Sequence, residues 1–213
     1  MSLTLTRPHR IAAACVALAA LTSLGIQFIA EGQQLGEAAT APRVLWLMAR
    51  YFTILTNTAV ALIFGITAFY ARWTGPGWPA AATVWIVATG GVYHALLAGT
   101  NVSIGIEVWS NVGMHTVVPV LTALLWLIAA PKAPLTYLHP VIWTLYPLLY
   151  AIYALIRGLI DGRFPYFFLD PTRLGWPMVA TFILGLGVFF VLSGSALVLI
   201  ARLLTPANRQ PSD

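Results

Sequence analysis

Apolar residues fill six long blocks of the chain, and short polar or proline-containing stretches separate these blocks. A helix needs about 20 apolar residues to cross the hydrocarbon core of a bilayer. The helices that we expect cover residues 10–30, 44–71, 79–99, 110–130, 138–159 and 176–203. The pattern therefore predicts an all-α polytopic membrane protein, in which residues 1–213 form one integral membrane domain: a bundle of six transmembrane helices joined by short loops.

The first block has a second interpretation. Arg7 and Arg10 precede a run rich in alanine and leucine, which is an arrangement typical of signal peptides. The run is as long as a full membrane span, however, and no clean small-x-small cleavage site precedes Glu31. We therefore expect this block to be a retained helix.

The composition excludes the main classes of water-soluble protein. Apolar residues make up 60% of the chain and charged residues only 8%, against roughly 25% charged residues in soluble domains. The net charge of +5 comes from basic residues scattered between the apolar blocks. This distribution favours contact with lipid headgroups, and we expect the bilayer as a partner and no nucleic acid.

Six crossings place both termini on one side of the membrane. If the termini are inside, the inside segments carry six basic residues, namely Arg7, Arg10, Arg72, Lys132, Arg202 and Arg209, and the other side carries the remaining five of the 11. Positive residues favour the cytoplasmic side, so we expect cytoplasmic termini. The arginine-rich, alanine-rich composition and the short loops indicate a bacterial inner (plasma) membrane.

Polar side chains within the apolar blocks need a partner or a purpose, because they are costly in hydrocarbon. In the second helix Arg50, Thr53 and Asn57 follow a spacing of three and four, which puts them on one stripe. Asn111 and His115 are four apart in the fourth helix. The third helix carries His94, and the fifth carries a stripe of Tyr146, Tyr150, Tyr153 and Arg157.

These side chains share one depth. The second and fourth helices run in the same direction, and Thr53 and His115 both lie within roughly 5–10 Å of the same face. The third and fifth helices run the other way, and His94 and Arg157 lie toward their far ends. We therefore expect one polar layer beneath one leaflet. Taken singly, each of these residues also fits a structural role, such as a hydrogen bond between helices or an arginine that reaches the headgroups.

A hydroxyl beside an imidazole forms the minimal pair of nucleophile and base for attack on an ester. Asn57, Asn111 or an arginine could stabilise the oxyanion. Pro119 has no N–H for the carbonyl of His115, so we expect a bend and a free acceptor there. The chain contains no G-x-S-x-G, H-E-x-x-H or glycine-rich phosphate motif.

Three short runs resemble the androgen-induced membrane protein family. They are Tyr51-Phe52-Thr53-Ile54, the segment from Asn111 to Pro119 that contains Gly-Met-His-Thr, and Phe164-Pro165-Tyr166-Phe167-Phe168-Leu169-Asp170. Their order and approximate spacing also match. The resemblance implies a multi-pass threonine hydrolase that cleaves fatty acid esters of hydroxy fatty acids, with Thr53 as nucleophile and His115 as its catalytic partner.

Our main hypothesis is therefore a membrane-embedded lipid ester hydrolase without a metal or other cofactor. The roles of Arg50, Asn57, His94, Asn111 and Arg157 in substrate or oxyanion binding are inferred from their depth alone. Two alternatives stay open. One is a non-enzymatic transporter or scaffold, and the other is a haem or quinone protein with His94 and His115 as an axial pair.

Overall fold

The computed structural model describes residues 4–99 and 103–205, and within these ranges the chain forms helices and no strand. Six helical segments are long and apolar enough to cross a membrane. This confirms the predicted all-α bundle. The six segments are Arg7–Ala38, Phe52–Phe69, Gly77–Leu97, Glu107–Ala129, Leu138–Asp161 and Trp176–Leu203.

Several of these segments contain more than one kind of helix. The α-helices are α1 (Arg7–Leu35), α2 (Ala41–Met48), α3 (Phe52–Phe69), α4 (Gly77–Val92), α5 (Glu107–Val112), α6 (Val118–Ala129), α7 (Leu138–Asp161), α8 (Pro171–Leu174) and α9 (Trp176–Leu203). Two π-helical turns, η2 (Tyr93–Leu97) and η3 (Gly113–Val117), continue α4 and join α5 to α6. Two short 3-10 turns are η1 (Gly36–Ala38) and η4 (Phe167–Leu169).

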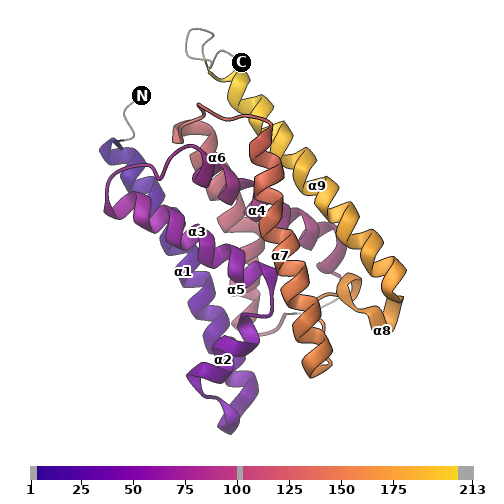
Figure 1. Cartoon of the computed structure of the whole chain (residues 1–213). Coiled ribbons are helices and arrows are strands. Elements are labelled where there is room, and N and C mark those ends of the chain that lie inside the picture. Colours follow the sequence, from indigo (N-terminus) through magenta and orange to yellow (C-terminus); the bar gives the residue numbers. More distant parts are fainter. Residues whose placement is uncertain (1–3, 100–102, 206–213) are drawn as a thin grey trace.

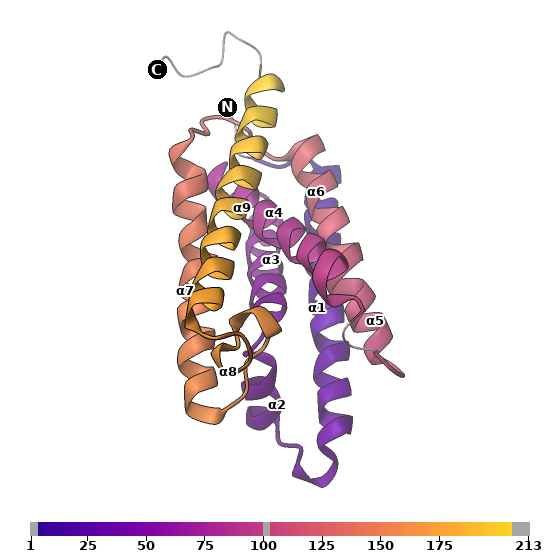
Figure 2. The same cartoon turned by 90° about the vertical axis from the view of Figure 1, so that its right-hand side faces the viewer.

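Helix α4 lies in the middle of the bundle and packs against α3, α6 and α9, while α1 runs along α3 and α7 runs along α9 (Figures 1 and 2). Residues 79–86 of α4 are all buried. Three consecutive alanines, Ala80 to Ala82, allow this because their small side chains let neighbouring helices approach on every side. The start of α1 and the end of α9 lie at one end of the bundle, and α2 and α8 lie at the other end (Figure 1).

The predicted continuous helix over 44–71 is wrong. The chain leaves the helix between α2 and α3, and Tyr51 has an extended backbone (φ −95°, ψ 133°). Carbonyl groups freed by this break need donors in a membrane. The hydroxyl of Tyr150 donates to the carbonyl of Arg50 (2.8 Å), and that of Tyr153 donates to the carbonyl of Ala49 (3.1 Å). The tyrosine stripe of α7 therefore stabilises the break.

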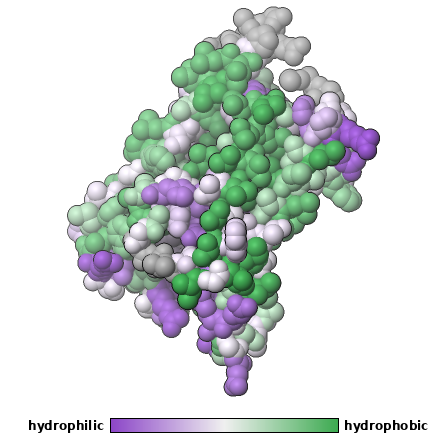
Figure 3. All heavy atoms as spheres, turned by 180° about the vertical axis from the view of Figure 1, so that it is seen from behind, coloured by the Kyte–Doolittle hydropathy of each residue, from purple (hydrophilic) through white to green (hydrophobic). Residues whose placement is uncertain are grey.

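The surface has the distribution expected of an integral membrane protein. Large apolar side chains on several helices face outward, among them Leu18, Leu62, Leu149 and Leu192. On the face seen in Figure 3, hydrophobic residues cover much of the molecule, and hydrophilic residues gather mainly toward the lower end and at the edges. These apolar faces would contact lipid.

Candidate active site

Thr53 and His115 meet across the interface between α3 and η3. The Thr53 hydroxyl oxygen lies 3.1 Å from Nε2 of His115. Thr53 belongs to the first turn of α3, directly after the helix break, and His115 occupies the centre of the π turn. Threonine is buried and the histidine half-buried. The two side chains that the sequence placed at one depth therefore lie within direct hydrogen-bonding distance, the range that proton transfer needs.

The protonation of the imidazole follows from its partners. Nδ1 of His115 faces two oxygens of Asn111: the amide oxygen Oδ1 at 2.6 Å and the backbone carbonyl at 3.1 Å. Both are acceptors, so Nδ1 carries the hydrogen in the neutral ring. Nε2 then offers its lone pair to the Thr53 hydroxyl. This is the tautomer that a general base requires.

Asn111 is itself held in place. Its NH₂ group donates to the hydroxyl of Tyr93 (2.7 Å) and to the hydroxyl of Ser103 (2.9 Å), which fixes the amide oxygen toward His115. The ring of Tyr93 stacks on the imidazole, with centroids 3.9 Å apart and planes inclined by 18°. The imidazole is thus fixed by Asn111 at one edge and by Tyr93 on one face.

Asn57 ties the backbones of the two elements together. Its side chain is fully buried, and its NH₂ group donates to the carbonyl of Thr53 (2.9 Å) and lies 3.5 Å from the carbonyl of Met114. These contacts direct the donor hydrogens of Asn57 to backbone groups. Asn57 therefore supports the relative position of Thr53 and His115.

His94 pairs with a different threonine. Its Nε2 lies 3.0 Å from the hydroxyl of Thr116, on the exposed side of η2 and η3. Because Thr116 directly follows His115 in the π turn, His94 contacts the residue next to His115. The structure thus places His94 beside the Thr53–His115 pair and gives it a separate hydroxyl partner.

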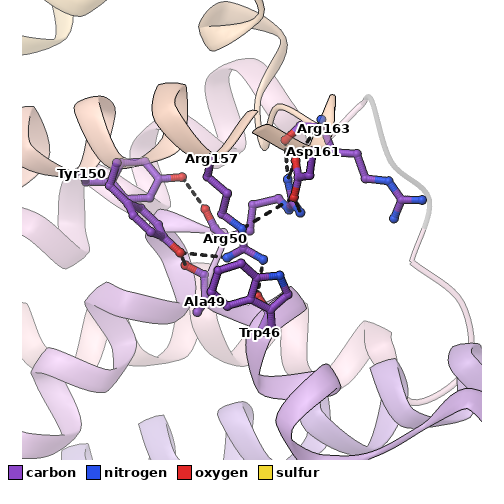
Figure 4. Close-up of polar contacts among 8 residues, drawn as sticks. Trp46, Ala49, Arg50, Tyr150, Arg157, Asp161 and Arg163 are labelled. Atoms are coloured by element: carbon purple, nitrogen blue, oxygen red, sulfur yellow. Dashed lines mark hydrogen bonds and ion pairs between the residues drawn. The ribbon is translucent and has the colours of Figure 1, made fainter. Parts of the chain in front are cut away.

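The two arginines of the expected layer form a separate cluster at the helix break (Figure 4). Arg50 donates to Asp161 (Nη1 to Oδ1, 2.9 Å) and to the carbonyl of Arg163. Arg157 donates to the hydroxyl of Tyr153 (2.8 Å). Its guanidinium also bonds the carbonyl of Trp46 and lies 3.9 Å from the centre of that indole ring. The hydrogen bond from Arg50 to Asp161 raises the pKa of the arginine, so the guanidinium stays charged.

The expected single layer is therefore two clusters. Thr53, Asn57, Asn111, His115 and His94 gather between α3, η2 and η3, and Arg50 and Arg157 bind Asp161 and the backbone around the break between α2 and α3. Asp161 was missed as a site residue, although it follows Arg157 by four positions on α7, the spacing of a helical ion pair.

A cavity of about 70 Å³ lies on one side of Thr53, between α3, α4, α7, α9 and the segment 166–169. Five lining residues carry hydroxyl groups, and the rest of the wall is apolar. The hydroxyl residues are Thr53, Thr89, Tyr93, Tyr150 and Tyr166. The apolar wall includes Leu97, Leu148, Phe168, Ile183, Leu186 and Phe190. The nucleophile candidate thus borders a mostly hydrophobic space.

Tyr93 and Tyr166 were also missed as site residues. The only sequence signal for Tyr93 is its place next to His94, and nothing in the spacing shows that its ring lies on His115. Tyr166 belongs to one of the runs that carry the family resemblance, but the resemblance implies no role for it.

A comparison with models of protein families, with curated proteins and with solved structures finds no match to this chain. Among the described residues, no group of three or more histidine, cysteine or acidic side chains is arranged to hold a metal ion.

Proposed function

We propose that the protein is a membrane-embedded lipid ester hydrolase, in which Thr53 is the nucleophile and His115 the general base. The observation that carries the proposal is the 3.1 Å contact between the Thr53 hydroxyl and Nε2 of His115, at the wall of an apolar cavity. The resemblance of three sequence runs to threonine hydrolases of fatty acid esters agrees with it.

In the first half of the reaction, the Thr53 oxygen attacks the carbonyl carbon of the ester while its proton moves to Nε2 of His115. The carbonyl π electrons move onto oxygen and form a tetrahedral oxyanion. When this oxyanion collapses, the bond to the alcohol oxygen breaks, and Nε2 returns the proton to the leaving alkoxide. The products are a free alcohol and an acyl ester of Thr53.

In the second half, water attacks the acyl carbon and His115 takes its proton. Collapse of the second oxyanion breaks the bond to the Thr53 oxygen, which regains the proton from His115. The carboxylic acid leaves, and the free hydroxyl is restored. Throughout, Asn111 holds Nδ1 so that Nε2 keeps facing Thr53, a positioning role like that of the third member of a catalytic triad.

The cavity supports this class of substrate. Its wall is apolar on α4, α7 and α9, and its volume of about 70 Å³ suits the part of an acyl chain next to the ester carbonyl, with that carbonyl beside Thr53. Burial contributes about 0.8 kcal/mol for each CH₂ group, so the chain supplies most of the binding energy. A fatty acid ester of a hydroxy fatty acid, the substrate class implied by the resemblance, fits this description.

The proposal includes a location. We place the chain in a bacterial inner membrane with both termini in the cytoplasm, as the basic residues favour. The helix break and the start of α3 lie toward the end of the bundle opposite the termini (Figure 1). In this orientation Thr53 and the cavity lie in the outer half of the membrane, and the bilayer delivers the ester sideways.

Hydrolysis of a long-chain ester by the purified protein tests the proposal. Thr53→Ala and His115→Ala should each lower kcat by about 10³-fold or more, because each removes one member of the nucleophile–base pair. A serine/threonine-directed fluorophosphonate probe should label the native chain at Thr53.

Thr58→Ala is the matched control, because Thr58 lies on the exposed side of α3 and its hydroxyl bonds the carbonyl of Ile54 (2.8 Å). It should hydrolyse the ester as the native protein does. Equal turnover by native protein, Thr53→Ala and His115→Ala would remove the mechanism and leave a non-enzymatic transporter or scaffold as the better interpretation.

A further inference from the structure

Ester hydrolysis needs a hydrogen-bond donor for the oxyanion, and the side-chain donors expected from the sequence are directed to other groups. The NH₂ groups of Asn57 and Asn111 bind backbone carbonyls and hydroxyls, respectively. The guanidinium groups of Arg50 and Arg157 bind Asp161, Tyr153 and backbone carbonyls. A different group therefore has to face the developing charge.

The hydrogen bonds of the hydroxyl groups around the cavity show which of these groups could donate to the oxyanion. Thr89 donates to the carbonyl of Trp85 (2.8 Å), and Tyr150 donates to the carbonyl of Arg50 (2.8 Å). The Tyr93 hydroxyl accepts a hydrogen bond from Asn111 on the Nδ1 side of His115, whereas Thr53, the attacking group, lies on the Nε2 side. Tyr166 is therefore the remaining cavity-lining tyrosine that could donate to the oxyanion.

Tyr166 lies beside Thr53 on the cavity wall. It follows the last turn of α7, and its ring centroid lies 6.4 Å from that of Tyr150 and 6.3 Å from that of Tyr51, which precedes Phe52 and Thr53 in the chain. Its phenol is near enough to the Thr53 side chain, the backbone of Phe52 and Thr53 and the Tyr150 side chain for these groups to lower its pKa, and all four residues line the same cavity. Stacking on Phe168, with centroids 5.1 Å apart, holds the ring in place.

The phenol is also in the right protonation state to donate. Burial raises the pKa of Tyr166 above its ordinary value, because the charged phenolate would lose the solvation that water gives it. The hydroxyl hydrogen therefore stays on the oxygen at neutral pH. A neutral phenol can donate a hydrogen bond without giving up its proton.

We propose that Tyr166 is a further catalytic residue, which donates its phenolic hydrogen to the carbonyl oxygen of the ester and to the oxyanion formed when Thr53 adds. In the free protein Tyr166 and Thr53 line the same cavity wall. When substrate enters, its carbonyl oxygen lies between the phenol and the Thr53 oxygen. The tyrosine keeps its proton throughout, so the proton balance stays with Thr53 and His115. This inference rests on the proposed hydrolase function.

Tyr166→Phe tests the proposal because it removes one oxygen and keeps the ring that packs on Phe168. We expect kcat for a long-chain ester to fall by about 10²- to 10³-fold, as it does when an oxyanion donor is lost, with KM changed by less than about threefold. Binding of a long-chain trifluoromethyl ketone, whose adduct with Thr53 bears the oxyanion, should weaken by a similar factor.

Tyr51→Phe is the matched control, since Tyr51 belongs to the same aromatic group but does not line the cavity. It should retain native kcat and ketone affinity, and both variants should keep the native unfolding temperature. A Tyr166→Phe variant with native kcat, or one that loses activity only through KM, overturns the role of Tyr166. If Thr53→Ala is inactive in the same experiment, the hydrolase proposal survives that result; if Thr53→Ala is active, the hydrolase proposal fails and Tyr166 loses its role with it.

Discussion

The backbone carbonyl of His115 packs directly against Gly90 of α4. A Cβ atom at position 90 would lie 2.6 Å from that oxygen and 3.2 Å from the ring of Pro119. Pro119 has no N–H to offer the carbonyl of His115, and the helix widens into the π turn just before it. Glycine at position 90 therefore lets α4 reach the wall of the π turn that presents His115 to Thr53.

Gly90→Ala should disturb the active site although Gly90 itself takes no part in the reaction. The new methyl group cannot coexist with the carbonyl of His115 unless the π turn moves, and a shift of about 1 Å costs roughly 100-fold in rate. We expect a loss of that size in kcat for ester hydrolysis. Gly91→Ala is the control, because nothing lies within 4 Å of a Cβ atom there. If both variants keep native activity, the packing of Gly90 does not position His115.

Asn111→Ala should lower kcat without removing the base. Nδ1 of His115 loses the amide oxygen at 2.6 Å but keeps the backbone carbonyl at 3.1 Å. We therefore expect a loss of about 100-fold, smaller than the roughly 10⁴-fold loss when the orienting aspartate of a serine protease is replaced. Steady-state kinetics with the long-chain ester measure it.

Ser103→Ala removes only one of the two partners of the Asn111 NH₂ group and should cost less than tenfold. Asn111→Asp keeps an acceptor for Nδ1 and should retain more activity than Asn111→Ala. An Asn111→Ala variant as active as the native chain would show that the imidazole needs no orienting group here.

The sequence predicts the bundle well because its main determinant is local. Each span needs its own run of apolar residues, and this requirement does not depend on distant partners. Helix α9 begins and ends at the predicted residues, 176 and 203. The common depth of Thr53 and His115 also follows from local information, namely their distance from the start of each span and the alternating directions of the helices.

The break between α2 and α3 could not be predicted in the same way. Its stretch of sequence, Ala49-Arg50-Tyr51, contains no glycine or proline, and apolar residues continue on both sides. The hydrogen-bond donors that stabilise the break are Tyr150 and Tyr153, about one hundred positions later in the chain. The roles of Arg50 and Arg157 depend on the same distant contacts, so depth alone could not separate them from the Thr53 cluster.

Asp161→Asn should destabilise this break. The carboxylate accepts hydrogen bonds from both terminal nitrogens of Arg50 and lies 3.8 Å from Nε of Arg157. Its neutralisation therefore leaves two neighbouring guanidinium groups without their common counter-charge. We expect the thermal unfolding midpoint in detergent to fall by a few degrees, and ester hydrolysis to fall as well because Thr53 follows the break by two residues.

Glu37→Gln provides the comparison, because it removes an acidic charge from an exposed turn at the same end of the bundle. Its unfolding midpoint and its activity should match those of the native chain. Equal midpoints for the two variants would mean that the contact between Arg50 and Asp161 adds nothing measurable to the stability of the break.

Gly187 of α9 offers a way to narrow the cavity without touching the reacting groups. It lies on the cavity wall, and a Cβ atom there would make ordinary contact with Leu148, at 3.8 Å. Gly187→Leu should fill part of the space that the acyl chain occupies in the cavity. Loss of burial for two CH₂ groups amounts to about 1.6 kcal/mol, or roughly a tenfold change in rate. We therefore expect kcat/KM for a long-chain ester to fall about tenfold relative to a short-chain ester.

Gly185→Leu, on the exposed side of the same helix, should leave that ratio unchanged. If Gly187→Leu lowers kcat/KM equally for both chain lengths, the cavity does not hold the acyl chain and the ester reaches Thr53 from another direction.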